Sequence, residues 1–142
     1  MPGLFPPAAT AIERWITTLP DEATSERVRD DFWFVRLPGV ARKWIGVEIE
    51  AGERSVKVTS HVIIEPDENH ADVYALLLRH NHQASGVAFS LDGKEGVICL
   101  VTRLNEVTPT SLDDAVGMIV QKTEEIFRSI LSIGFASRMK TR

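Results

Sequence analysis

The chain has 142 residues, of which 44% are hydrophobic and 25% charged, and this size and composition suit a single globular domain. Acidic residues outnumber basic residues by 20 to 16, so the formal net charge is −4. Because binding to nucleic acid depends on neutralising phosphates, we expect no nucleic-acid partner. No apolar run approaches the roughly 20 residues that span a bilayer, and we expect no membrane association.

A single cysteine, Cys99, excludes a disulfide within the chain and fits a reducing compartment. The first ten residues, MPGLFPPAAT, lack the basic flank and the long apolar stretch of a secretory signal. These two features together predict a cytoplasmic protein.

The first half of the chain predicts one helix followed by three strands. Residues 1–9 contain three prolines and should form a flexible arm. Thr10 and Glu13 have the spacing of a capping box, and the helix that they begin should end at Pro20. Residues 21–31 are charged and predict a loop. Segments rich in aromatic, β-branched and alternating residues then predict strands at 32–37, 42–50 and 54–64.

The second half predicts a helix, a hairpin and a long final helix. Residues 65–81 contain a proline and acidic turn followed by a leucine-rich helix. Strands are expected at 86–91 and 96–104. The last helix should start near Pro109, with Thr110 or Ser111 as its cap. The element order α-β-β-β-α-β-β-α predicts an α+β fold, in which an antiparallel five-stranded sheet carries its helices on one face.

The second helix is apolar around more of its circumference than one packing surface requires. A helix packed once against a sheet needs an apolar arc of roughly 100°. We hypothesise that the flank formed by Tyr74, Leu77 and Leu78 packs against a second subunit or a partner segment. The alternative is that the last helix or the N-terminal helix of the same chain covers this flank.

The sequence contains no recognised motif for catalysis or for cofactor binding. A nucleophile elbow, a phosphate-binding loop and a dinucleotide-binding turn are all missing. Cys99 lies in the apolar run VICLV, where a buried thiol is expected to be inert. We therefore expect no catalytic residue and no cofactor.

The four histidines do not have the spacing of a metal site on a helix. His80 and His82 would point to nearly opposite sides of the second helix, and no pair has the i, i+4 spacing of zinc-binding helices. We expect no metal site, and a spatial pairing of His61 with Glu65 or Glu68 is the one arrangement left open. The remaining histidine, His70, is expected near the start of the second helix.

Three carboxylates, Glu65, Asp67 and Glu68, cluster before the second helix. Acidic groups favour the positive end of a helix dipole, so we interpret them as capping groups. The alternative is that they act as general acid and base, which requires a pocket and perturbed pKa values.

Several segments resemble the bacterial YbjN-like family. HVIIEPDENHADVYALLLRHN, residues 61–81, resembles its central signature, in which a strand ends in a proline, acidic and asparagine turn and a leucine-rich helix ends in Arg-x-Asn. Residues 86–104 resemble the following hairpin, and FRSILSIGFASR, residues 127–138, resembles the C-terminal ending. The resemblance covers most of residues 31–138. The positions that match the central signature are Pro66, Glu68, Asn69, Tyr74, Leu77, Leu78, Arg79 and Asn81.

The resemblance implies a fold similar to that of type III secretion chaperones, which act as homodimers that hold extended protein segments. YbjN-like proteins are described as sensory-transduction or stress regulators with no established reaction, so the family supplies no catalytic residue. We expect a single YbjN-like domain at 10–138 with a tail at 139–142. Its expected function is that of a homodimeric, non-enzymatic protein-binding domain, chaperone-like or regulatory.

Two other functions stay open. The first is a small-molecule-binding sensor or an enzyme that uses the Glu65–Glu68 acidic cluster. The second is a structural subunit of a larger complex, recruited through the C-terminal tail.

Overall fold

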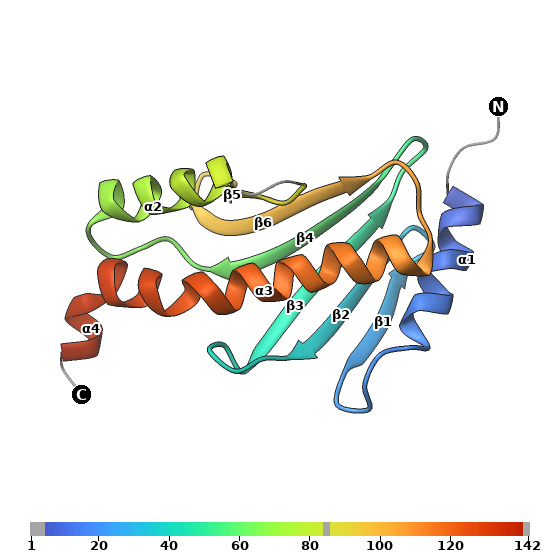
Figure 1. Cartoon of the computed structure of the whole chain (residues 1–142), viewed down its shortest axis with the longest axis horizontal. Coiled ribbons are helices and arrows are strands. Elements are labelled where there is room, and N and C mark those ends of the chain that lie inside the picture. The colour runs from blue at the N-terminus through green and yellow to red at the C-terminus, as the bar shows by residue number, and fades with distance from the viewer. Residues whose placement is uncertain (1–4, 84–85, 141–142) are drawn as a thin grey trace.

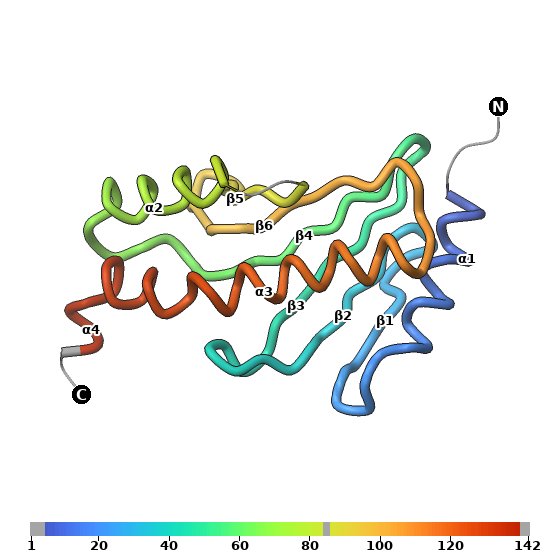
Figure 2. Tube along the Cα trace, viewed as in Figure 1, coloured from blue at the N-terminus to red at the C-terminus, as the bar shows by residue number. Residues whose placement is uncertain are grey.

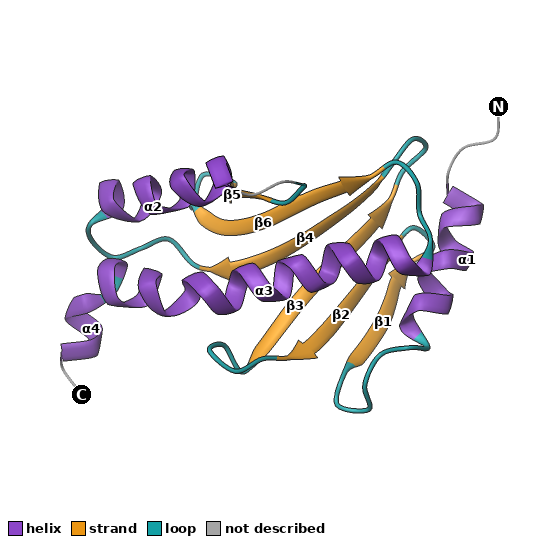
Figure 3. Cartoon of the chain, in the orientation of Figure 1, coloured by secondary structure: helices purple, strands orange, loops and turns teal. Residues whose placement is uncertain are grey.

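The computed structural model describes residues 5–83 and 86–140, which form a sheet with helices on one face (Figures 1 and 3). The helices are α1 (Phe5–Ile16), α2 (His70–Gln83), α3 (Pro109–Gly134) and α4 (Ala136–Lys140). The strands are β1 (Thr24–Arg29), β2 (Phe32–Pro38), β3 (Trp44–Ala51), β4 (Val56–Ile63), β5 (Ala88–Asp92) and β6 (Val97–Leu104). They lie in the order β1-β2-β3-β4-β6-β5, and all neighbours are antiparallel.

The α+β class and the placement of helices on one face are confirmed, but the described residues form six strands rather than five. The additional strand, β1, lies within the predicted loop 21–31. All six of its residues, TSERVR, are exposed. The strand therefore lacks the alternation of apolar and polar residues from which a half-buried strand is predicted. Pairing with β2 makes it a strand, and Arg27 stacks over the Trp33 ring at 4.7 Å.

The prediction of a flexible arm at 1–9 is wrong from Phe5 onward, because α1 begins there. Pro6 lies in the first turn of the helix, where a missing N–H costs no hydrogen bond. Ala8 is buried in the core. Thr10 is not the cap that the sequence predicted, since its hydroxyl donates to the Pro6 carbonyl at 3.4 Å inside the helix. Residues 1–4 lie outside the described part of the chain.

The core lies between the sheet and α3, which runs along most of the molecule (Figures 1 and 2). Side chains at helical spacing along α3 are fully buried against inward-facing side chains of the central strands. The helix begins at Pro109 as predicted, but its cap is Thr108, which forms a capping box with Ser111. The fully buried α3 side chains are Leu112, Ile119, Thr123, Ile126 and Ile130.

The outer face of the sheet carries no helix among the described residues. Aromatic residues on this face include the half-buried Phe32 and Trp44 and also Phe34, which is 37% exposed. Arg36 stacks over the Trp44 ring at 4.4 Å. Trp15 and Trp33, in contrast, are fully buried on the inner face. The aromatic residues are therefore divided between core and surface.

The predicted C-terminal tail at 139–142 begins inside a helix. Met139 and Lys140 belong to α4, and residues 141–142 lie outside the described residues. None of the helices in the described part of the chain is long and apolar enough to cross a membrane.

Candidate interaction surface

The helix α2 has one buried side and one open side. Val73 and Leu77 are buried, at 0% and 5% exposure, and α2 packs against α3 and β5. Tyr74 is half-buried and meets the His70 ring edge-on, with ring centroids 5.9 Å apart. Leu78 is 68% exposed. Of the three predicted surface residues, Leu77 is therefore largely core, and Leu78 is the residue most available to a partner.

A groove of about 300 Å³ lies between α2 and the edge strand β5. Its apolar wall on the strand is formed by Phe89 and Leu91, and Leu91 is 49% exposed. The sequence prediction did not include these strand residues, because they become neighbours of α2 only when the sheet forms. We call this groove with its exposed rim the α2–β5 surface; its lining residues are Tyr74, Leu77, Leu78, Asn81, Phe89, Ser90 and Leu91.

The side chain of Asn81 occupies the hydrogen-bonding edge of β5. Phe89 N donates to Asn81 Oδ1 at 2.6 Å, and Asn81 Nδ2 donates to Phe89 O at 3.1 Å. These are the two bonds that a residue of a neighbouring strand would make. A partner at the α2–β5 surface would therefore contact side chains rather than extend the sheet at Phe89.

The sequence offered the last helix or the N-terminal helix of the same chain as an alternative partner for this flank, but neither helix covers Leu78. The helix α3 packs against α2, where Gly134 approaches Val73 closely enough that a Cβ on Gly134 would lie 3.1 Å from Val73 Cγ2. Leu78 nevertheless stays 68% exposed among the described residues. The exposed end of the flank is thus not covered by either helix named in the prediction.

The acidic cluster connects the turn before α2 to the C-terminal helix. Arg138 donates to both carboxylate oxygens of Asp67, at 2.6 and 3.0 Å. Glu68 accepts a hydrogen bond from the backbone of Ser137 in the first turn of α4, at 2.7 Å. Glu65 Oε1 lies 3.5 Å from Nε2 of His70, the first residue of α2. The sequence interpreted Asp67 and Glu68 as capping groups of the second helix, whereas these hydrogen bonds of their side chains join them to α4.

The backbone of the same turn fits closely against the end of α3. Asp67 N and Glu68 N both donate to Gly134 O, at 2.9 and 3.2 Å. Asn69 has a positive φ of 55° and donates from its side chain to Ile133 O at 2.9 Å. Short polar side chains tolerate this left-handed conformation. The resemblance matched Glu68 and Asn69, and in the structure both hold the turn before α2 against the C-terminal end of the domain.

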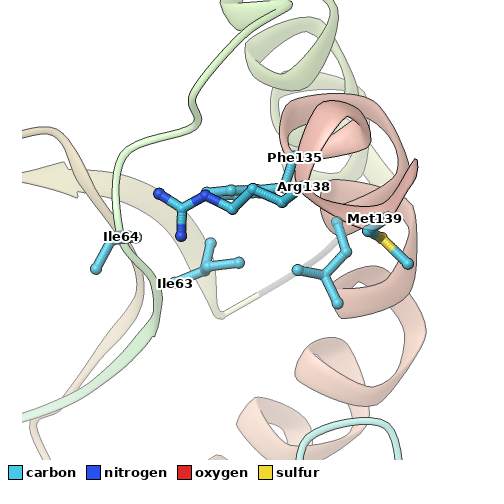
Figure 4. A pocket seen from close by; sticks show the side chains of 6 residues that line it. Ile63, Ile64, Phe135, Arg138 and Met139 are labelled. Carbon is cyan, nitrogen blue, oxygen red and sulfur yellow. The ribbon is translucent and has the colours of Figure 1, made fainter. Parts of the chain in front are cut away.

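A second apolar groove, of about 310 Å³, opens beside α4 (Figure 4). Ile63 and Ile64 line one side at the end of β4, and Phe135 and Met139 line the other. Ile64 is 56% exposed and Met139 is 52% exposed. The guanidinium of Arg138 extends across the groove and lies 5.4 Å from the Phe135 ring centre.

The histidines occupy separate environments. His70 and His80 lie on α2, where His80 meets the Phe89 ring edge-on at 6.2 Å, and His82 is exposed. His61 lies on β4, with Nε2 at 3.1 Å from Asp92 Oδ2. The pairing of His61 with Glu65 or Glu68, which the sequence left open, is replaced by this contact with Asp92.

Cys99 is 1% exposed in β6, and its thiol lies 3.6 Å from Val97 O. Burial and, to a smaller extent, the nearby charges of Asp92 and Glu48 together raise the pKa of Cys99 to about 11. The thiol is consequently neutral near pH 7 and a weak nucleophile, as its apolar sequence context predicted.

Comparison with known proteins places the chain in a bacterial family. Residues 10–132 match the family model YbjN, described as "Putative bacterial sensory transduction regulator". An uncharacterised protein of Mycobacterium tuberculosis (strain H37Rv) is 37% identical over 108 residues, and one of Mycobacterium leprae is 35% identical over 108. These alignments cover 75% of this chain but only 58% of each relative. The match to the family model spans most of the domain, and the chain belongs to the YbjN family.

Proposed function

We propose that this chain is a non-enzymatic, regulatory protein-binding domain that forms a homodimer through the α2–β5 surface. The observation that carries the proposal is the exposure of Leu78 and Leu91 on the two sides of an apolar groove. Exposed apolar side chains that lie together mark interaction surfaces more often than single ones do. The family description supports a regulatory role, and the free thiol of Cys99 supports a cytoplasmic location.

A second copy is the occupant to which the proposal commits. In a twofold dimer the same patch meets itself, so an apolar, self-complementary surface suffices on both sides. The apolar rim residues Leu78 and Leu91 offer such a surface. Because Asn81 occupies the backbone of Phe89, the dimer would form by packing of α2 side chains and would not form a continuous sheet across Phe89.

In such a dimer the groove beside α4 would stay accessible to a different protein (Figure 4). Ile64 and Met139 give it an apolar rim, and Phe135 lies within it. An apolar segment of a partner protein is the ligand that this lining suits. The apolar character of both grooves supports protein binding over the alternative of an enzyme or a small-molecule sensor.

Light scattering coupled to size-exclusion chromatography tests the dimer. We expect wild-type protein at micromolar concentration to have twice the chain mass of 15.8 kDa. Leu78→Asp should reduce the mass to that of one chain, because it places a charge in the interface at an exposed position that the fold does not need. The matched control is Val28→Asp, a residue of β1 that is 50% exposed on the opposite edge strand.

Two results would contradict the dimer proposal. One is a wild-type mass equal to a single chain at concentrations up to hundreds of micromolar. The other is a Leu78→Asp variant that keeps the wild-type mass and the wild-type circular dichroism spectrum.

For the groove beside α4, we expect Met139→Asp to abolish capture of a defined protein partner while the mass of the dimer stays unchanged. Capture of a bound metabolite and no protein would favour the sensor alternative.

A further inference from the structure

Three metal-ligating side chains from three neighbouring strands meet on the outer face of the sheet. The potential ligand atoms of His61, Asp92 and Cys99 all lie within 4.8 Å of one another. β6 lies between β4 and β5, and Cys99 pairs with His61 on one side and with Ser90 on the other. The carboxylate of Asp92 comes from the end of β5, two residues beyond Ser90.

The three side chains have the arrangement of a partly assembled metal site. His61 Nε2 and Asp92 Oδ2 are 3.1 Å apart, close to the roughly 3.3 Å that separates two ligand atoms in a tetrahedral site with metal bonds of 2.0–2.2 Å. The buried thiol of Cys99 completes the cluster beside them. The side chains of His61 and Asp92 are 44% and 64% exposed, so both are free to rotate by the small amount needed to approach the sulfur.

Glu48 on β3 lies within ion-pair distance of the second ring nitrogen of His61. Its Oε1 lies 3.9 Å from His61 Nδ1, on the opposite side of the ring from Asp92. Histidine ligands commonly direct their second ring nitrogen to a carboxylate, which fixes the ring orientation and raises its basicity. His61 also lies at a change of register in the β4–β6 pairing, and bulges of this kind redirect side chains.

The charges around the cluster favour a cation. The carboxylates of Asp92 and Glu48 lie near Cys99, and among the described residues they outweigh the nearby positive charge of Lys57. Binding of a divalent cation by the sulfur would stabilise the thiolate directly and release one proton to solvent.

We propose that His61, Asp92 and Cys99 form a binding site for a zinc-class divalent cation, with Glu48 as the residue that positions His61. A thiolate, an imidazole and a carboxylate together suit zinc and cobalt(II) and do not suit magnesium or calcium, which require oxygen ligands. Three protein ligands leave a fourth position open to water or to a ligand atom from another molecule. A bound cation would link β4, β6 and β5 through their side chains. The site lies on the outer face of the sheet, which no described helix covers.

The test uses untagged full-length protein, treated with a chelator and dialysed, and titrated with cobalt(II). Because Cys99 is the only cysteine of the chain, a thiolate-to-cobalt charge-transfer band reports on this residue alone. We expect the band to saturate at one cobalt per chain and to disappear when zinc displaces the cobalt. In Cys99→Ser the band should be absent.

Variants at the exposed ligands keep the test independent of core packing. His61→Ala and Asp92→Asn should each weaken zinc affinity, measured by calorimetry, by about 10-fold or more, and Glu48→Gln should weaken it by about 10-fold. The control is His82→Ala, an exposed histidine on α2 outside the cluster, which should leave the affinity unchanged. Absence of the charge-transfer band in wild type would overturn the proposal. So would zinc affinity that is insensitive to His61→Ala and Asp92→Asn, or that falls equally in His82→Ala.

Discussion

The side-chain amide of Asn81 in α2 forms a pair of hydrogen bonds with the backbone N–H and carbonyl of Phe89 in the edge strand β5. An unpaired edge strand is a template for association with another chain, and proteins commonly protect such edges. The amide supplies one donor and one acceptor, so α2 takes the place of a seventh strand at this residue. The same contact fixes the distance between α2 and β5, and therefore the width of the groove between them.

Replacement of Asn81 by Ala should destabilise the domain. Both backbone groups of Phe89 would lose their partners in a partly buried position, and unfolding free energy should fall by about 1–3 kcal/mol. Urea denaturation followed by tryptophan fluorescence measures this change. The neighbouring His82→Ala, at an exposed position, is the control and should change stability by less than about 0.5 kcal/mol. Equal stability of Asn81→Ala and wild type would show that the amide contact contributes nothing.

Two glycines of α3 should respond in opposite directions to substitution by Ala. A Cβ on Gly134 would lie 2.9 Å from Pro66 Cβ and 3.1 Å from Val73 Cγ2, so Gly134→Ala should separate α3 from the turn before α2 and destabilise by about 1–3 kcal/mol. A Cβ on Gly117 meets nothing within 4 Å in the described structure. Gly117→Ala should stabilise by about 0.5–1 kcal/mol, because Ala has the higher helix propensity. Thermal unfolding of both variants gives the comparison, and a shift of the same sign in both would contradict it.

The turn between β2 and β3 should depend on one carboxylate of α3. Glu124 accepts hydrogen bonds from Val40 N at 2.8 Å and from Ala41 N at 2.6 Å. Glu124→Ala should reduce stability by about 1–2 kcal/mol, since charge-assisted bonds to a partly exposed backbone are lost. Glu125→Ala removes an exposed carboxylate one residue later and is the control. Amide hydrogen exchange at Val40 and Ala41 should accelerate only in Glu124→Ala.

The reactivity of Cys99 in metal-free protein should be limited by its protonation and its burial. The folded-state pKa of about 11 lies above the ordinary value of 9.0, so the thiolate fraction near pH 8 is about a hundredfold lower than that of an ordinary cysteine. Modification by iodoacetamide, followed by mass spectrometry, should therefore be slow at pH 8, accelerate toward pH 11, and become fast on denaturation. A rate at pH 8 equal to that of the denatured chain would contradict the burial of the thiol.

The predicted interaction residues differ in how well the sequence could place them. Helical periodicity placed Leu78 on an apolar flank of the second helix, and Leu78 is 68% exposed in the structure. It could not separate Leu77, which is buried, from Leu78, because the angle at which α2 crosses α3 decides which neighbour is covered. Leu91 belongs to the same surface but lies 13 positions further along the chain, so only strand pairing brings it there.

The errors in the predicted fold share a physical cause. The strand β1 has no buried side chain, and α1 begins in a proline pair that appeared to exclude a helix. In both cases tertiary contacts override a weak local signal: β2 supplies hydrogen bonds to β1, and the burial of Ala8 stabilises the first turn of α1. The acidic turn was assigned to the nearest helix in sequence, whereas Asp67 and Glu68 bind α4, about 70 residues away.

The sequence by itself determined the α+β class, the helices α2 and α3, most of the strands and the family. Each of these depends on patterns within a few residues, where hydrophobic periodicity and turn residues act locally. The tertiary structure alone decided which surfaces stay open and which side chains from distant positions meet. The Asn81–Phe89 contact, the link from Asp67 to Arg138 and the cluster of His61, Asp92 and Cys99 all depend on strand order and helix packing, which local patterns do not specify.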